Sequence, residues 1–158
     1  TEIYYNSCGL SDKEGISDIY FNNDTSIIAS LYKRQLDHFD IDFNRHASIR
    51  TTTMDSYCEE NHINKVDLLK IVVEGSEYNV LLGAGKMMSE GRIQMIQFGF
   101  GGTAIDSRHF FRDYWNLFRL YKYDVYRIMK DGLIRMEHYD EGFELYHYIN
   151  FLAVYAGE

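Results

Sequence analysis

The run from Val66 to Val73 constrains the fold of this chain more than any other segment. Its sequence, Val-Asp-Leu-Leu-Lys-Ile-Val-Val, is almost continuously apolar, which is typical of a central parallel strand covered on both faces. Gly75 ends the strand, and apolar residues at helical spacing then predict a helix over residues 76–88. A second strand is predicted over residues 93–98, breaking at Gly99. A strand, a helix and a strand in this order form a parallel unit.

The remaining segments complete an α/β sheet with an antiparallel end. Asp131 and Gly132 predict a two-residue turn between strands at 125–129 and 133–136, because this pair tolerates the positive φ angles of a type I′ turn. Thr53 and Asp106 are candidate N-caps. We expect further strands over residues 3–10, 16–21, 48–52 and 143–155, helices over residues 54–62 and 107–121, and a mobile insert over residues 22–45. No linker or repeat interrupts this pattern, so residues 1–158 are predicted to be a single domain.

Charge and cysteine content narrow the possible partners. The formal net charge of −8 argues against a nucleic-acid backbone or an anionic membrane. No apolar run reaches the roughly 20 residues that span a bilayer, and a signal-peptide pattern is lacking, so we expect a cytoplasmic protein.

Cys8 and Cys58 lack a CxxC spacing and are expected to be free thiols. The acidic stretch 37–42 lacks the closing Glu of a calcium loop, and we predict no metal site.

Several motifs occur in an order that is found in a known family. Residues 54–58 read Met-Asp-Ser-Tyr-Cys, residues 67–77 read Asp-Leu-Leu-Lys-Ile-Val-Val-Glu-Gly-Ser-Glu, and residues 80–84 read Val-Leu-Leu-Gly-Ala. Together they resemble the FkbM type of S-adenosylmethionine-dependent methyltransferases. Residues 8–12, Cys-Gly-Leu-Ser-Asp, look like the third strand of that family, and residues 106–118 and 132–151 are similar to its closing portion.

The resemblance implies a Rossmann-like methyltransferase sheet with a parallel centre and an antiparallel terminal hairpin. It also implies S-adenosylmethionine as cofactor and a small molecule or glycan as acceptor, with methylation of a hydroxyl on a sugar or natural product. In the family, a Gly-rich turn after the first strand and an acid after the second hold the methionine and ribose parts of the cofactor. Neither element is found here, and Thr1 already precedes strand-forming residues. We therefore expect that the first two strand–helix units are missing and that upstream residues were lost or left out.

The resemblance also shows where acids of the family are replaced. The family has an Asp at the position of Val72 and commonly a Glu at that of Gly99. Methyl transfer to a weakly acidic hydroxyl needs positioning and a base. Their replacement leaves open a second function, a truncated or degenerate relative that binds a partner without catalysis. Lys70, inside the strand, and Glu74, at its end, remain as catalytic candidates, and an ion pair is the structural alternative for Lys70.

Three residues are candidates for cofactor binding. Ser11 and Asp12 follow the predicted strand 3–10 and would approach the adenine ring, but their turn is also typical of a plain surface loop. Glu77 lies in the first turn of the predicted helix 76–88, where the helix dipole alone favours a carboxylate. Both readings stay open for each residue.

The missing units would leave one edge of the strand at residues 66–73 unpaired and remove the helical cover of one of its faces. Strand 3–10 would move over to pair with it, two chains would pair edge to edge as a homodimer, or residues outside this sequence would fill the position. We expect the third arrangement, and the homodimer next.

Overall fold

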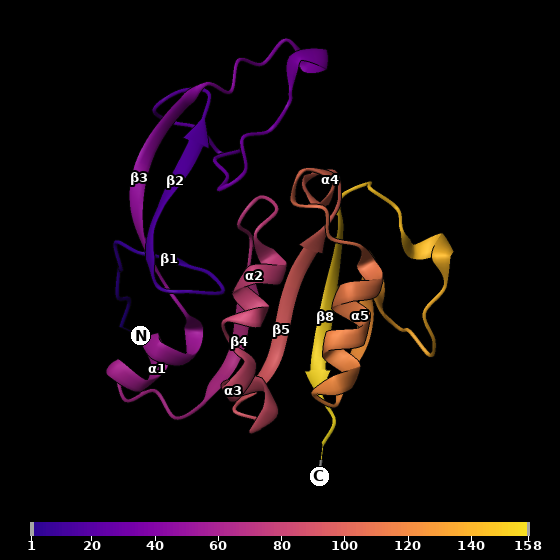
Figure 1. The fold of residues 1–158 in the computed structure, drawn as a ribbon. Helices are drawn as coiled ribbons and strands as arrows, with labels where there is room; N and C mark the ends of the chain where they lie inside the picture. Colours follow the sequence, from indigo (N-terminus) through magenta and orange to yellow (C-terminus); the bar gives the residue numbers. More distant parts are fainter. Residues whose placement is uncertain (1, 158) are drawn as a thin grey trace.

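The computed structural model describes residues 2–157, which form two β-sheets with helices between their strands (Figure 1). The strands are β1 (Gly9–Leu10), β2 (Gly15–Phe21), β3 (Arg45–Thr52), β4 (Val66–Ile71), β5 (Ile93–Phe100), β6 (Tyr123–Met129), β7 (Gly132–Arg135) and β8 (Ile149–Tyr155). The helices are α1 (Met54–Glu60), α2 (Glu77–Leu82), α3 (Gly85–Ser89), α4 (Thr103–Ser107) and α5 (Phe111–Leu120), with 3₁₀ turns η1 (Asp37–Phe39) and η2 (Glu141–Phe143). The fold is mixed α/β, as the sequence predicts.

The larger sheet has the strand order β4-β5-β8-β6-β7. β4 and β5 run parallel, with Val66 opposite Ile93 and Ile71 opposite Phe98. β8 lies antiparallel between β5 and β6, and β6 forms a hairpin with β7. The predicted combination of parallel and antiparallel pairing is confirmed. β8 is the last strand in the sequence, but it lies inside the sheet and not at its edge.

An aromatic core lies between this sheet and the helices α2, α3 and α5, which share one face of it (Figure 1). Phe98 of β5 is fully buried, and its ring centroid lies 5.3 Å from that of Tyr114 on α5 and 5.5 Å from that of Phe151 on β8. Burial of these large rings supplies much of the hydrophobic stabilisation, and their stacking fixes α5 on the sheet.

The other face of β4 is open. Leu68 and Val72 point away from the buried Ile71 and remain 50% and 51% exposed. This exposure agrees with the expectation that one face of residues 66–73 lacks its helical cover. An apolar run indicates that a strand belongs inside a sheet. It does not show which faces of the strand are covered in the described residues.

The smaller sheet has the order β1-β3-β2, with β1 parallel and β2 antiparallel to β3. The predicted strand over residues 3–10 is wrong, because only Gly9 and Leu10 pair with a neighbour and Tyr4 and Tyr5 are exposed. Strand-forming residues do not form a strand without a partner backbone beside them. β1 pairs with β3 and not with β4, so the first of the three expected arrangements is not found. Within residues 2–157, β4 has a single neighbour, β5.

The predicted helix 76–88 is two helices, which meet at Gly83 and Ala84. A Cβ on Gly83 would lie 2.0 Å from the Ser11 carbonyl oxygen, so the chain passes the end of β1 too closely for any side chain. Asp55 of α1 then accepts hydrogen bonds from the N–H groups of Lys86 (2.8 Å) and Met87 (2.9 Å) and caps α3. The apolar periodicity continues across the break because both helices bury residues in one core.

The predicted helix 107–121 is also shorter than expected. Asp106 lies inside α4 and is not an N-cap, since Arg108 in the left-handed region (φ 59°) ends α4 and α5 begins at Phe111. The Glu144 carboxylate accepts hydrogen bonds from the N–H groups of Phe111 (2.7 Å) and Arg112 (3.0 Å). This helix start is capped by a residue near the end of the chain, which no local pattern reveals.

The carboxyl-terminal hairpin is confirmed, but its turn is Lys130–Asp131, because Met129 pairs with Gly132. The long strand predicted over residues 143–155 is limited to β8, and η2 precedes it. β5 continues through Gly99 to Phe100 instead of ending at residue 98.

Three local predictions are confirmed in type and place. These are the strands at residues 16–21 and 48–52 and the helix at residues 54–62. Thr53 caps that helix, since its side chain accepts a hydrogen bond from the Ser56 N–H at 3.0 Å. The expected insert at residues 22–45 holds η1 and otherwise irregular chain up to the start of β3. No helix within residues 2–157 is long and apolar enough to cross a membrane.

Candidate active site

The carboxyl ends of β4 and β5 lie at one end of the larger sheet, where α4 and the segment between β2 and β3 are also found (Figure 1). Ligands of open α/β sheets bind at such an edge. In the loop after β4, Glu74 has a φ of 50° and Gly75 a φ of 106°. A Cβ on Gly75 would come within 2.9 Å of the Thr103 carbonyl oxygen. The loop therefore packs directly on the start of α4.

Glu77 fixes the shape of this loop. Its carboxylate accepts hydrogen bonds from the Val73 N–H at 3.1 Å and from the Gly75 N–H at 2.9 Å. Only 5% of the residue is exposed, and burial raises the pKa of its carboxyl group although the backbone donors oppose the shift. Both oxygens already accept hydrogen bonds from the loop, so within the described residues Glu77 holds the backbone of the loop in its shape.

Arg34 connects the segment between β2 and β3 to the strand ends. Its Nε donates to Asp106 Oδ2 at 3.0 Å, and its Nη1 lies 3.6 Å from Glu74 Oε2. The Ser30 hydroxyl donates to the Glu74 carbonyl oxygen at 2.7 Å. All three charged side chains are largely buried, and such charge-assisted contacts are stronger than those in open water. Arg34, Glu74 and Asp106, here called the carboxylate–arginine cluster, form the chemically richest group at this edge.

An apolar pocket of about 200 Å³ lies between the two sheets. The buried hydroxyl of Ser76 has no hydrogen-bond partner among the described residues, and Ser76 is only 1% exposed. A buried hydroxyl without a partner costs free energy. The pocket is lined by Gly9, Leu10, Ile19, Ala29, Ser30, Leu31, Ile49, Val72, Val73 and Ser76.

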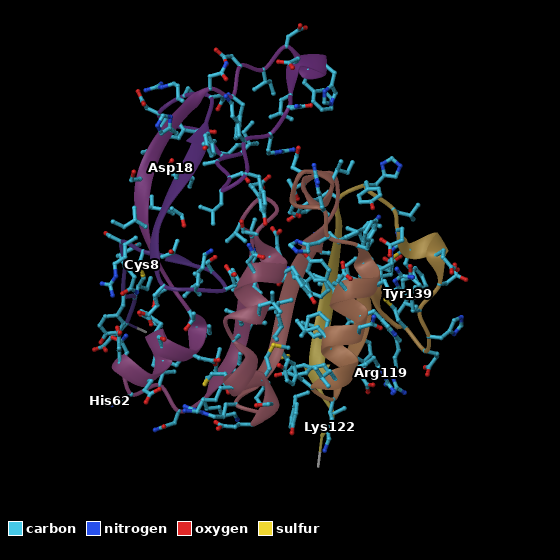
Figure 2. All side chains as sticks on the ribbon, viewed as in Figure 1. Cys8, Asp18, His62, Arg119, Lys122 and Tyr139 are labelled. Carbon is cyan, nitrogen blue, oxygen red and sulfur yellow. The ribbon has the colours of Figure 1, made fainter. Side chains whose placement is uncertain are left out.

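Ser11 and Asp12 directly follow β1, whose residues Gly9 and Leu10 line the apolar pocket. Ser11 is buried and its hydroxyl donates to Asp12 Oδ1 at 3.0 Å. Both residues line a pocket of about 420 Å³ together with Tyr32 and with Asp18, which is labelled on the smaller sheet in Figure 2. The structure thus places these two residues beside the apolar pocket's β1 wall, because they follow Leu10 directly.

Lys70 is not part of the carboxylate–arginine cluster. It lies within β4 on the open face, beside Leu68 in the alternation of the strand, and it is exposed. The ammonium group is hydrated there, so the desolvation cost that would demand an anionic partner does not arise in the described residues.

The two positions that lack acids have different surroundings. Val72 lines the apolar pocket, whereas Gly99 lies beneath Tyr148. A Cβ on Gly99 would come within 2.8 Å of the Tyr148 hydroxyl oxygen. Burial and the nearby charges of Glu74 and Glu77 raise the pKa of Tyr148, so its hydroxyl stays protonated near neutral pH. A phenol thus stands at the position where the resemblance leads us to expect an acid.

Sequence reasoning missed Arg34, Asp106 and Tyr148. Arg34 lies in a segment without periodicity, and Tyr148 reaches Gly99 only through the antiparallel pairing of β8 with β5. Asp106 had a usable signal, since it follows the glycine-rich carboxyl end of β5, where site residues collect. Among the described residues, no three potential metal-ligating side chains gather at one place.

Comparison with models of protein families finds a match to the methyltransferase FkbM domain over residues 1–125. The match includes Arg34, Glu74 and Asp106 and ends within β6, so Tyr148 lies outside it. No curated protein and no solved structure matches the chain.

Proposed function

Because this chain belongs to the FkbM family of methyltransferases, we propose that it is part of an S-adenosylmethionine-dependent enzyme that methylates a hydroxyl group of a sugar or natural product. The observation that carries the proposal is the family match over a segment in which Arg34 pairs with Glu74 and Asp106 at the strand ends, beside a pocket. The cytoplasm is the expected location.

The apolar pocket suits the adenine end of the cofactor. A flat heterocycle needs apolar walls, which Leu10 supplies from β1 and Val72 from the chain just after β4, and a polar group for its edge, which the unpartnered Ser76 hydroxyl supplies. Ser11 and Asp12 adjoin the same wall. The cofactor, when bound, supplies a methyl group on a sulfonium sulfur.

Glu74 is the proposed proton acceptor. An ionised carboxylate only accepts hydrogen bonds, so it binds a hydroxyl through its proton and can take that proton as the oxygen becomes methylated. Arg34 holds the Glu74 side chain at the strand ends, and Glu77 holds the backbone of the loop from below. Lys70 remains a candidate by position in the strand alone.

The larger sheet supports a Rossmann-like arrangement. A parallel pair followed by a strand that returns antiparallel between its neighbours is what the proposal requires of the second half of the sheet. In the proposal, two further strand–helix units belong beside the free edge of β4. An edge-to-edge homodimer is the alternative occupant of that edge.

Saturation-transfer NMR with S-adenosylhomocysteine tests the proposal on the 158-residue chain. We expect weak, saturable binding in the millimolar range, with the adenine protons receiving more saturation than the methionine protons. Ala29→Trp fills the apolar pocket and should abolish the signal, while Ala156→Trp, at an exposed position after β8, should leave it unchanged. Absence of any signal, or a signal that survives Ala29→Trp, would refute the assignment of the pocket.

A further inference from the structure

A second pocket, of about 590 Å³, opens next to the carboxylate–arginine cluster. One wall is the segment around η1, and the other is α4 with the residue before it. Arg34 and Asp106 belong both to this pocket and to the cluster, so the pocket adjoins Glu74. The two walls are held together by the Arg34–Asp106 contact at 3.0 Å.

Two large apolar side chains remain uncovered in this pocket. Phe39 on η1 is 65% exposed and Ile105 on α4 is 61% exposed. The ring centroid of His38 lies 4.2 Å from that of Phe39, so the two rings form a small aromatic platform. Exposed apolar groups that line a concave site rimmed by polar residues are typical of a ligand site. A ligand with one apolar face would cover them.

The polar groups of the pocket select the other side of the ligand. Asp37 and Asp106 are acceptor-only when ionised, and the Arg34 donors are directed at Asp106 and Glu74. These carboxylates favour a ligand that supplies hydrogen-bond donors, while Gln35 and His38 in the same lining also carry N–H donors. Asp37, Asp106 and Glu74 outnumber Arg34, so the region has a net negative charge and an anionic ligand is disfavoured.

We infer that this pocket binds the methyl acceptor, and that the acceptor is a neutral sugar ring. A sugar has an apolar face of C–H groups for Phe39 and Ile105, and hydroxyl donors for Asp37 and Asp106 on its rim. Arg34, which lines the pocket, connects it to Glu74 through the 3.6 Å contact between Arg34 Nη1 and Glu74 Oε2. The inference rests on the proposed function for the chemistry, but the binding itself can be measured without any cofactor.

The experiment compares two probes that differ by one carboxylate, methyl α-glucopyranoside and the corresponding methyl glucuronide. Saturation-transfer NMR on the 158-residue chain should give saturable signals for the neutral sugar. The dissociation constant of the uronic acid should be about tenfold higher. Phe39→Ala should weaken binding of the neutral sugar by about tenfold. Asp37→Asn should reduce the discrimination against the uronic acid. Ile27→Ala is the matched control, since Ile27 is 91% exposed in the same segment but does not line the pocket.

Each result decides the inference. Equal binding of the two sugars, no binding of either, or neutral-sugar binding that Phe39→Ala leaves intact would overturn it. Thermal unfolding of each variant shows whether a lost signal reflects loss of the fold, and Asp37→Asn changes only an exposed side chain. Adenine signals from S-adenosylhomocysteine without sugar signals would reject the acceptor pocket and keep the methyltransferase function. The reverse result would keep a sugar site and reject the cofactor pocket.

Discussion

Glu77 binds the backbone of the loop that precedes it, with its Oε2 accepting the Gly75 N–H at 2.9 Å. This carboxylate, on the first residue of α2, thus fixes the loop that presents Glu74 to the site. It belongs to one of the motifs that resemble the methyltransferase family. Its contacts explain that motif by the shape of the loop, without any ligand.

The first prediction concerns the pH dependence of this contact. The pKa of Glu77 is raised by burial in the folded state, so the group contributes stability below its unfolded pKa of about 4.3 and loses it as pH rises through the folded pKa. Chemical denaturation of wild type and Glu77→Gln over a pH series isolates the group. The wild-type free energy of unfolding should fall relative to that of the variant as pH rises above about 4.3. A difference that is constant or grows with pH would contradict the raised pKa.

The second prediction tests the close approach of Gly83 to Ser11. Gly83 has an ordinary φ of −73°, so alanine there meets only the steric problem of a Cβ 2.0 Å from a backbone oxygen. Gly83→Ala should lower the free energy of unfolding by about 3 kcal/mol or more, measured by urea denaturation. Gly102→Ala is the control, because its nearest neighbour would be 3.8 Å away. Equal effects of both substitutions would mean that β1 and α2 are not packed this closely.

The confirmed and the wrong predictions differ in where their determinants lie. Thr53 and Ser56 are three residues apart, so the start of α1 is readable from the sequence. The break between α2 and α3 depends on Ser11, and the start of α5 depends on Glu144, both far away in the chain. Local pattern predicts that an element exists, but contacts between distant segments decide where it ends.

The candidate site shows the same division. Glu74 is predictable because it follows a clear strand, and it does lie at the strand ends. Its partner Arg34 comes from a segment without periodicity, and only the fold brings the two within 3.6 Å. The resemblance located the family but not this ion pair, because ion-pair geometry depends on how an irregular segment folds back.

The third prediction concerns Glu144 at the start of α5. Besides capping the helix, Glu144 Oε1 accepts a hydrogen bond from the Tyr139 hydroxyl at 2.8 Å (Tyr139 is labelled in Figure 2). Burial and this carboxylate raise the pKa of Tyr139 to about 12. Glu144→Ala should therefore lower the pKa of Tyr139 and reduce the free energy of unfolding by about 1–2 kcal/mol.

Ultraviolet titration checks the first of these effects. The spectrum of Tyr139→Phe is subtracted from that of the parent protein, once with Glu144 and once with Glu144→Ala. The difference curve should move to lower pH in the second pair. An unmoved curve would show that burial alone raises the pKa.

The last prediction concerns Tyr148 and Gly99. A side chain at position 99 would start 2.8 Å from the Tyr148 hydroxyl oxygen, so Gly99→Glu forces the ring to move. The ring can move into solvent, since Tyr148 is exposed, but it then loses its contact with β5. We expect Gly99→Glu alone to lower the free energy of unfolding by about 1–3 kcal/mol, which is usual for overpacking.

A double-mutant cycle identifies the cause. In a Tyr148→Ala background, Gly99→Glu should cost at least about 1 kcal/mol less than in wild type, because the space above Gly99 is then free. Gly101→Ala serves as the contrast, since its Cβ would meet the Tyr148 backbone at 2.9 Å and truncation of the Tyr148 side chain leaves that clash in place. Additive costs for Gly99→Glu and Tyr148→Ala would show that the ring does not occupy this space. A coupled pair, together with an additive Gly101→Ala, would establish that a tyrosine fills the position where related enzymes are expected to have an acid.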